Sequence, residues 1–456
     1  MENLRAAITV YITNYNYGKY IDQAIKSVLS QTFKDFELII IDDGSKDNSK
    51  KIIDKYKTNK KIRIIYQKNR GLNISNNIAL KLSKGKYIIR LDADDWFDNH
   101  ALEILYKSIE KDNKIGLVFP DYFEVDEQGD IINITRRHDF KKVTLRDQAA
   151  HGACTLIRTE FLKKMGGYNE SFSRQDGYDV WVKFIDKYHV KNINLPLFYY
   201  RQHTGSLSKN TKKLLSTRSE ILKRNIDQKK LKKKKGLAII PVRGLTINPN
   251  SFVLKKLGKK PLLNWSIDIL LKSRKISKVI VTTPDQNIID YLKTKYKDKI
   301  ITLKRDEKLG GINVPIEETI IKSVNFAKKI NIKFDYIFEI SYKNPFLTVK
   351  DVETSINLLE FFKTDQVISV LPENDMFFQH DGNGLKPIKN FHGLKLEREE
   401  IFRDTGSIRV VRKKFKHNSD RKIKKIGHLA TDEKSSFTIN TNLDFLIAQK
   451  VLSKKI

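Results

Sequence analysis

An acidic cluster directly after an apolar run in the first half of the sequence has the spacing of a metal site. Asp92 and Asp94 follow the strand-like segment Tyr87–Leu91. Alternate residues of a strand project the same way, so the two carboxylates can converge on one point. Neighbouring carboxylates repel unless a cation or a proton offsets their charge. Mg²⁺ or Mn²⁺, held by oxygen ligands and bridging to a diphosphate, would offset it; the alternative is a polar helix cap at Asp95 or Asp98.

A second pair of carboxylates, Asp42 and Asp43, follows the apolar segment Glu37–Ile41 and precedes Gly44 and Ser45. Ligands of open α/β sheets bind beyond the carboxyl ends of the strands, so both side chains would face that crevice. A carboxylate there can accept hydrogen bonds from a ribose or a base. Asp-Asp-Gly-Ser is also a common turn, and the two interpretations stay open on these residues alone.

A third cluster contains Asp176 and Asp179, ahead of a helix-like segment. A carboxylate at a helix N-terminus often serves only as a cap. Beside a metal-bound sugar donor, the same group could deprotonate an acceptor hydroxyl. The cluster is therefore a candidate general base with a structural alternative.

Strand-like and helix-like segments alternate through both halves, which is typical of parallel α/β architecture. The sequence therefore predicts two α/β domains, each built on a mostly parallel sheet. The expected strands are Ala7–Thr13, Glu37–Ile41, Ile62–Tyr66, Tyr87–Leu91, Gly236–Pro241, Lys278–Thr282 and Tyr336–Ile340, and the expected helices are Tyr20–Ser30, Ser49–Tyr56, Asn73–Leu82, Pro261–Leu271 and Asp285–Tyr296.

The composition excludes several classes of protein. Hydrophobic residues make up 40% of the 456, enough for sizeable cores. The single cysteine, Cys154, forms no internal disulfide, and the N-terminus lacks the pattern of a signal peptide. No apolar stretch approaches the ~20 residues that span a bilayer. We expect a cytoplasmic protein, with peripheral binding at the inner face of the membrane as a further hypothesis.

The net charge of +33 suggests nucleic acid at first, but its distribution argues against such a partner. Residues 201–235 hold thirteen Lys and Arg against two Asp and Glu, a net charge of +11 in one short segment. Within it, residues 208–235 are predicted to be a basic helical linker, with Leu214, Ile221 and Ile226 at spacings of one helix face. It is either a solvated linker or an amphipathic segment on an anionic membrane surface.

Taken together and in order, the motifs of residues 1–207 resemble the family 2 glycosyltransferases, which have a GT-A fold. The resemblance is carried by Tyr15-Asn16, Gln31-Thr32, Asp42-Asp43-Gly44-Ser45, Asn69-Arg70-Gly71-Leu72-Asn73, Leu91-Asp92-Ala93-Asp94-Asp95, Gly166-Gly167-Tyr168, Asp176–Trp181 and Tyr200-Arg201-Gln202-His203.

This resemblance implies an inverting, metal-dependent transfer from a nucleotide-sugar, with a UDP-sugar favoured, to a glycan or lipid-linked acceptor in surface glycan biosynthesis. It implies Mg²⁺ or Mn²⁺ on Asp94 and Asp92. The base would be Asp176 or Asp179, with Asp176 favoured. The implied donor-binding residues are Thr13, Tyr15, Asp42, Asp43, Asn73, Asp92 and His203.

Residues 236–456 resemble the cytidylyltransferases that activate sialic-acid-like sugars as CMP conjugates. The match includes Pro241-Val-Arg243-Gly244, Pro261-Leu262 and Asp404-Thr-Gly406-Ser407. The family's phosphate-binding lysines are replaced by Ile247 and Phe252, and its metal-binding aspartates by Thr438 and Asn440.

The resemblance therefore implies a degenerate domain with a vestigial nucleotide site at Arg243, Gly244, Thr438 and Asn440. Two alternatives stay open: the domain still activates a sialic-acid-like sugar with CTP, or it is a non-catalytic binding or scaffolding module. A homo-oligomer formed through this domain is a further hypothesis.

Overall fold

The computed structural model describes residues 6–136, 149–173, 175–203, 211–226, 231, 233–245, 247–311, 314–373, 377–382, 384–388, 401–413 and 425–453. The chain forms two compact units. The N-terminal unit consists of Met1–Ile221 and Phe377–Glu399, and the C-terminal unit of Leu222–Met376 and Glu400–Ile456. None of the described helices has the length and apolar character needed to cross a membrane.

The main sheet of the N-terminal unit begins with four parallel strands in the order β3-β2-β1-β4. Antiparallel β8 follows β4, and β6, β9 and β5 continue the sheet, with β7 paired to β6. The strands are β1 (Ile8–Asn14), β2 (Phe36–Asp42), β3 (Ile62–Tyr66), β4 (Tyr87–Asp92), β5 (Trp96–Phe97), β6 (Ile115–Val125), β7 (Ile131–Thr135), β8 (Leu156–Arg158) and β9 (His189–Arg201).

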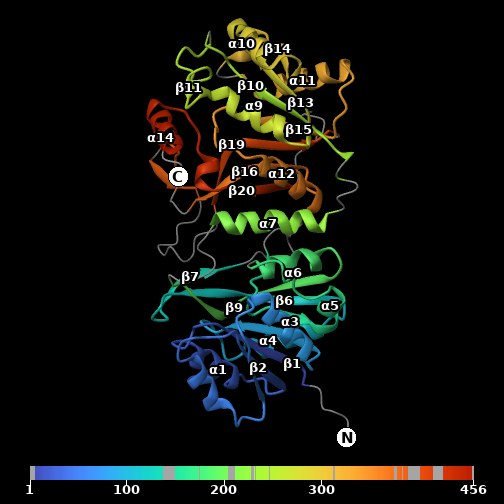
Figure 1. Ribbon diagram of the computed structural model, residues 1–456, viewed down its shortest axis with the longest axis vertical. Helices are drawn as coiled ribbons and strands as arrows, with labels where there is room; N and C mark the ends of the chain where they lie inside the picture. Colours follow the sequence, from blue (N-terminus) through green and yellow to red (C-terminus); the bar gives the residue numbers. More distant parts are fainter. Residues whose placement is uncertain are drawn as a thin grey trace. The chain divides into compact units, whose positions relative to one another are not determined.

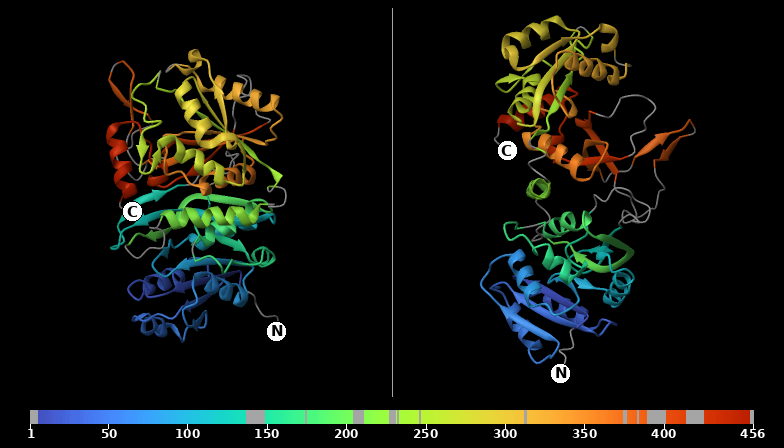
Figure 2. Two further views of the ribbon diagram at one scale, coloured as in Figure 1. Left: turned by 45° about the horizontal axis from the view of Figure 1, so that its top comes forward. Right: turned by 90° about the vertical axis from the view of Figure 1, so that its right-hand side faces the viewer.

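Helices connect these strands and lie on both faces of the sheet (Figure 1, Figure 2). Every residue of β1 is buried, including the polar residues Thr9, Thr13 and Asn14, as expected of a central strand covered on both faces. In α1, the buried residues Ile21, Ala24, Ile25 and Val28 recur at the spacing of one helix face. The helices are α1 (Ile21–Leu29), α2 (Ser49–Ile53), α3 (Leu72–Leu82), α4 (Ala101–Glu110), α5 (Thr159–Lys164) and α6 (Asp176–Ile185).

The C-terminal unit contains a seven-stranded sheet that opens with the same arrangement. Four parallel strands lie in the order β14-β13-β10-β15, and antiparallel β19 follows β15. The strands of this sheet are β10 (Gly236–Pro241), β13 (Ile276–Thr283), β14 (Ile301–Lys304), β15 (Tyr336–Ile340), β16 (Gln366–Glu373), β19 (Ile401–Arg412) and β20 (Ile426–Ala430).

Numbered within each unit by chain order, both sheets therefore begin 3-2-1-4 and then turn antiparallel. Two short hairpins complete the described strands: β11 (Lys256–Leu257) with β12 (Lys260–Pro261), and β17 (Phe378–His380) with β18 (Leu385–Pro387). The helices of the second series are α9 (Leu262–Lys272), α10 (Gln286–Tyr296), α11 (Ile316–Lys329), α12 (Val349–Phe361), α13 (Glu433–Ser436) and α14 (Asn442–Ser453). The expected strands and helices are present, with ends that differ by a few residues.

Helix α7 (Thr211–Asn225) occupies part of the predicted basic linker, of which residues 208–210, 227–230 and 232 lie outside the described residues. Ile221 and Leu222, on the expected apolar face, are buried. Arg218 Nε donates a hydrogen bond to Gln175 Oε1 at 2.6 Å. Ile221 and Leu222 are therefore covered by protein, whereas Leu214 and Ile226 are partly exposed. This packing, here called the packed-linker interpretation, differs from the predicted solvated linker and does not favour insertion of these two side chains into a membrane surface.

Candidate active site

The carboxyl ends of β1, β2 and β4 bring the predicted polar residues of the N-terminal unit to one edge of its sheet. In the strand register, Asn14 lies opposite Asp42, and Thr13 lies opposite Asp92. Thr13 Oγ1 is 3.5 Å from Asp92 Oδ1. Tyr15, the next residue beyond β1, has an exposed ring (43%). The predicted nucleotide-pocket residues Thr13, Tyr15 and Asp92 thus lie at the same sheet edge.

Asp42 and Asp43 are both buried, and each shapes a loop at this edge. Asp42 accepts hydrogen bonds from Asn14 Nδ2 at 2.7 Å and from the Ser45 amide at 2.9 Å. Asp43 Oδ1 accepts from Gln67 Nε2 and the Arg70 amide, and Oδ2 accepts from the Gly71 amide, at 2.7–2.9 Å. Both carboxylates therefore have local structural partners, in addition to any role with a ligand.

Asn73 has a different environment from the other predicted donor-binding residues. It is buried in the first turn of α3, and its Nδ2 donates to the carbonyls of Asn169 and Phe172, each at 2.8 Å. The side chain thus fixes the 169–172 loop against α3. Both hydrogen bonds of the Asn73 amide nitrogen are therefore made within the protein. Contact between Asn73 and a nucleotide-sugar stays a prediction.

Asp94, a predicted metal ligand, and His203, a predicted donor-binding residue, lie in contact. His203 Nε2 lies 2.9 Å from Asp94 Oδ2, and both side chains are almost entirely buried. The rings of Tyr17 and Tyr20 lie near the imidazole, with centroids 5.6 and 6.0 Å away. Within the described ranges, no third His, Cys, Asp or Glu completes a metal-binding group. A metal held here would thus take further ligands from a diphosphate or water.

Arg201 fixes the backbone of the loop that carries Asp94. Its Nε donates to the Asp94 carbonyl at 3.0 Å, and its Nη1 donates to the carbonyl of Glu127 at 2.7 Å. The Arg201 amide donates to Asp95 Oδ1 at 2.9 Å, and burial raises the pKa of Asp95 well above its usual range. Asp95 therefore anchors β9 and does not cap a helix, so the alternative of a cap at Asp95 is wrong.

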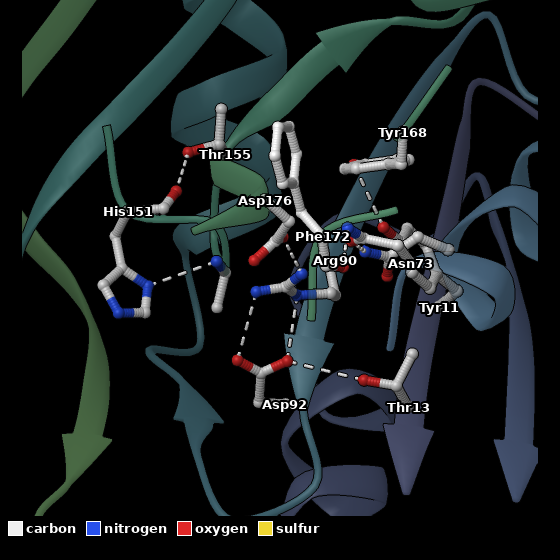
Figure 3. A network of polar contacts seen from close by, with 12 residues as sticks. Tyr11, Thr13, Asn73, Arg90, Asp92, His151, Thr155, Tyr168, Phe172 and Asp176 are labelled. Atoms are coloured by element: carbon white, nitrogen blue, oxygen red, sulfur yellow. Dashed lines mark hydrogen bonds and ion pairs between the residues drawn. The ribbon is translucent and has the colours of Figure 1, made fainter. Parts of the chain in front are cut away.

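Arg90 is the central group of the site (Figure 3). Its guanidinium forms an ion pair with Asp176 through Nη1 and with Asp92 through Nε at 2.9 Å. The two carboxylates raise the pKa of Arg90 well above its ordinary value, although burial opposes them. Burial raises the pKa of Asp92 to about 6, against the opposing effect of Arg90. One buried cation thus joins the predicted nucleotide pocket to the candidate base.

The two candidate bases have separate surroundings. Asp176 begins α6, but Gln175 is the N-cap residue and no side-chain capping bond forms there, so Asp176 is not a cap. Asp179 lies one turn later and pairs with Lys183, with Nζ 2.7 Å from Oδ2. Only Asp176 therefore contacts the Arg90 network, which favours it over Asp179.

The loop that contains Gly152 closely approaches the first turn of α6. A Cβ on Gly152 would lie 2.5 Å from Arg90 Nη2 and 3.0 Å from Asp176 Oδ2, so only glycine fits beside the ion pair. A Cβ on Gly177 would lie 2.8 Å from the Gly152 amide nitrogen. His151, which precedes Gly152 in the chain, accepts a hydrogen bond at Nδ1 from the Ala153 amide at 3.2 Å (Figure 3).

Sequence reasoning missed Arg90, Gly152 and the clamp by Arg201. The signal for Arg90 was available, because Arg90, Asp92 and Asp94 alternate along one strand and its end. Its pairing with Asp176 depends on a contact between residues 86 positions apart, which sequence spacing does not reveal.

The predicted nucleotide site of the C-terminal unit lies in a different chemical setting. Gly244 has a φ of 86°, and the neighbouring Leu245 amide donates to Asp285 Oδ2 at 2.8 Å. Thr438 Oγ1 accepts from Asn344 Nδ2 at 2.8 Å, and Asn440 Oδ1 accepts from Lys343 Nζ at 3.1 Å. The two neutral residues thus bind other parts of the protein. Arg243 is exposed at the end of β10.

The sheet of the N-terminal unit and the acidic residues at its edge define a GT-A-like glycosyltransferase domain. Residues 9–166 match the family described as Glycosyl transferase family 2, so this segment is a glycosyltransferase family 2 domain.

Relatives of the chain match the same half. This chain is 32% identical over 191 residues to the chondroitin synthase of Escherichia coli, and the match covers 41% of this chain and 28% of that protein. The hyaluronan synthase of Pasteurella multocida is also 32% identical over 191 residues, covering 41% of this chain and 19% of that protein. The chain therefore spans less than a third of either relative. The crystal structure of S. aureus TarS 1-349 in complex with UDP-GlcNAc is 19% identical, with a TM-score of 0.39, covering 48% and 65% of the respective chains.

Proposed function

We propose that the N-terminal unit transfers a sugar from a nucleotide-sugar to an acceptor hydroxyl with inversion at the anomeric carbon. The observation that carries the proposal is the position of Arg90, which bonds both Asp92 and Asp176. A residue predicted for the nucleotide pocket and a candidate base thus lie within reach of one side chain. Direct displacement requires the donor and the acceptor to be bound next to each other, and this arrangement would allow it.

Asp176 is the proposed base. Arg90 bonds Oδ2 of its carboxylate, and this contact holds the side chain beside Asp92 at the sheet edge. The acceptor hydroxyl would give its proton to Asp176 while its oxygen forms a bond to the anomeric carbon. The bond from that carbon to the nucleotide diphosphate breaks at the same time, so the diphosphate leaves with the electron pair and the configuration inverts.

Asp94 and His203 are the proposed metal ligands, because a carboxylate and an imidazole lie 2.9 Å apart at the sheet edge. Carboxylate oxygen suits Mg²⁺ and Mn²⁺, whereas imidazole suits the transition metals, so this pair favours Mn²⁺. A bound divalent ion would stabilise the negative charge of the departing diphosphate. Asp92, also predicted as a ligand, is instead paired with Arg90 and has only a supporting role in this proposal.

The proposed donor is a UDP-sugar, and the proposed acceptor is a glycan or a lipid-linked glycan of a cell surface. The names of the relatives, chondroitin synthase and hyaluronan synthase, support a glycan product. Only residues 9–166 match the family, so these names bear on the N-terminal unit alone.

A donor screen tests the proposal. The purified chain is incubated with UDP-, GDP-, dTDP- and CMP-sugars in Mn²⁺ or in EDTA, and nucleotide release and the anomeric configuration of the product are measured. We expect metal-dependent release from a UDP-sugar and an inverted product. A retained configuration would contradict the inverting mechanism, and release that persists in EDTA would contradict the metal role.

Two matched variants test the base. We expect Asp176→Asn to lose nearly all turnover but to bind donor, because it removes the proton acceptor alone. Asp179→Asn, which breaks the pair with Lys183, should lower stability more than turnover. If both variants keep near-normal turnover, the base lies elsewhere.

A further inference from the structure

Three basic side chains follow strands of the C-terminal sheet at the edge where the parallel strands end. Arg243 lies beyond β10, Arg305 directly follows β14, and Lys343 lies beyond β15. These strands belong to the parallel series β14-β13-β10-β15, so their carboxyl ends share one edge. Ligands of open α/β sheets bind at this edge.

Arg305 is buried, with 7% of its surface exposed, and its partners are neutral. Its Nη2 donates to the carbonyl of Val242 at 2.9 Å, and its Nη1 donates to Thr319 Oγ1 at 3.3 Å. Among the described residues, its Nε has no hydrogen-bond partner. The bond to Val242 brings this guanidinium beside Arg243, the next residue in the chain.

Lys343 is half-buried, and its Nζ donates to the neutral Asn440 at 3.1 Å. In the part of the chain that the structure describes, neither Lys343 nor Arg305 forms an ion pair. Burial, followed by the charge of Arg243, lowers the pKa of both groups. The nearby carboxylate of Asp285 instead accepts bonds from the Leu245, Asn287 and Ile288 amides, where it caps α10.

We propose that Arg243, Arg305 and Lys343 form a binding site for a phosphoryl group that requires no divalent cation. Phosphate oxygens would accept hydrogen bonds from the exposed Arg243 guanidinium and the Lys343 ammonium, while the charge of the buried Arg305 would add to the attraction. The positive charge of Lys343 would replace that of a metal, because Thr438 and Asn440 are neutral and bind other protein groups. The site lies in the C-terminal unit and is independent of the proposed sugar transfer.

Calorimetric titration of the full chain with inorganic pyrophosphate in EDTA tests this proposal. EDTA removes metal-dependent binding at the N-terminal unit, and the background variant Asp94→Asn confirms that the signal comes from elsewhere. We expect binding without metal that weakens at least tenfold in Lys343→Ala and recovers in Lys343→Arg. Lys293→Ala, which changes an exposed lysine of α10, is the matched control and should bind as wild type.

Orthophosphate, CMP and a sugar 1-phosphate, titrated in the same way, identify the source of the phosphoryl group by which of them binds tightest. Circular dichroism shows whether each variant is folded, and Lys343→Gln provides a second neutral variant if Lys343→Ala is not. Binding that appears only with Mg²⁺, that Lys343→Ala and Lys343→Gln leave unchanged, or that is absent for every probe would overturn the proposal.

Discussion

The two units share a strand order but carry opposite charges at the edge where the parallel strands end. In the N-terminal unit, Asp92 ends β4, the fourth parallel strand of the chain, and Asp94 follows it. In the C-terminal unit, Lys343 follows β15, which has the same place in its sheet. The two sheets thus place their candidate ligand-binding residues at the same edge, and the residues at and beyond the strand ends set the sign of the charge there.

The cation at each edge also differs in its partners. Arg90 pairs with two carboxylates, whereas Arg305 donates to a carbonyl and a hydroxyl. The charge of the first guanidinium is thus offset by two carboxylates within the protein. The second retains a net positive charge that a ligand can offset.

The largest expected effect tests the acidic edge. Asp94→Asn removes one of two proposed metal ligands, and we expect sugar transfer to fall by about 100-fold or more while the fold persists. The measurement is turnover of the donor at saturating Mn²⁺, with Glu160→Gln, an exposed residue of α5, as the control. Unchanged turnover in Asp94→Asn would contradict a metal-binding role for the acidic edge of the N-terminal unit.

A pair of matched substitutions tests the two guanidinium groups. Arg90→Met leaves Asp92 and Asp176 without their counter-charge, so we expect the free energy of unfolding of the N-terminal unit to fall by about 3–5 kcal/mol. Arg305→Met removes hydrogen bonds from the guanidinium to two neutral acceptors, and we expect a smaller fall of about 1.5–3 kcal/mol. Denaturant unfolding measures both, and equal losses would show that the two networks do not differ as described.

A smaller signal is expected from the C-terminal unit in a nucleotidyl transfer assay. Ile247, Phe252, Thr438 and Asn440 stand where the resembled cytidylyltransferases have lysines and aspartates, and phosphoryl binding alone does not align a triphosphate for attack. We expect no sugar-dependent pyrophosphate release from CTP, Mg²⁺ and a panel of sialic-like acids. Release at an enzymatic rate would make the bifunctional alternative the better account.

The smallest effect concerns the basic linker. Because Ile221 and Leu222 are buried, we expect any binding to anionic vesicles to be purely electrostatic. Co-sedimentation at rising salt measures it, since screening acts over ~8 Å at physiological ionic strength. Binding that survives high salt would show that apolar side chains insert, against the packed-linker interpretation.

The seven strands that the sequence predicted are present, because apolar runs and the acidic groups that follow them are local patterns. Asp94 and His203 were both predicted from the sequence, and their contact follows from strand ends that meet at one edge. The ion pair of Arg90 with Asp176 was not predictable, since it depends on the packing of α6 against β4. The sequence likewise does not distinguish Lys343 from the other lysines, because its position beside Arg243 depends on the pairing of β10 with β15.

The clamp formed by Arg201 has a consequence for local opening of the N-terminal unit. This one side chain bonds carbonyls of Asp94, Asp126 and Glu127 and the side chain of Gln23. None of these segments can separate from β9 without exposing the others, so they should exchange amide hydrogens as one cooperative group. The loop that carries Asp94 would thus be as slow to open as the strand end that holds it.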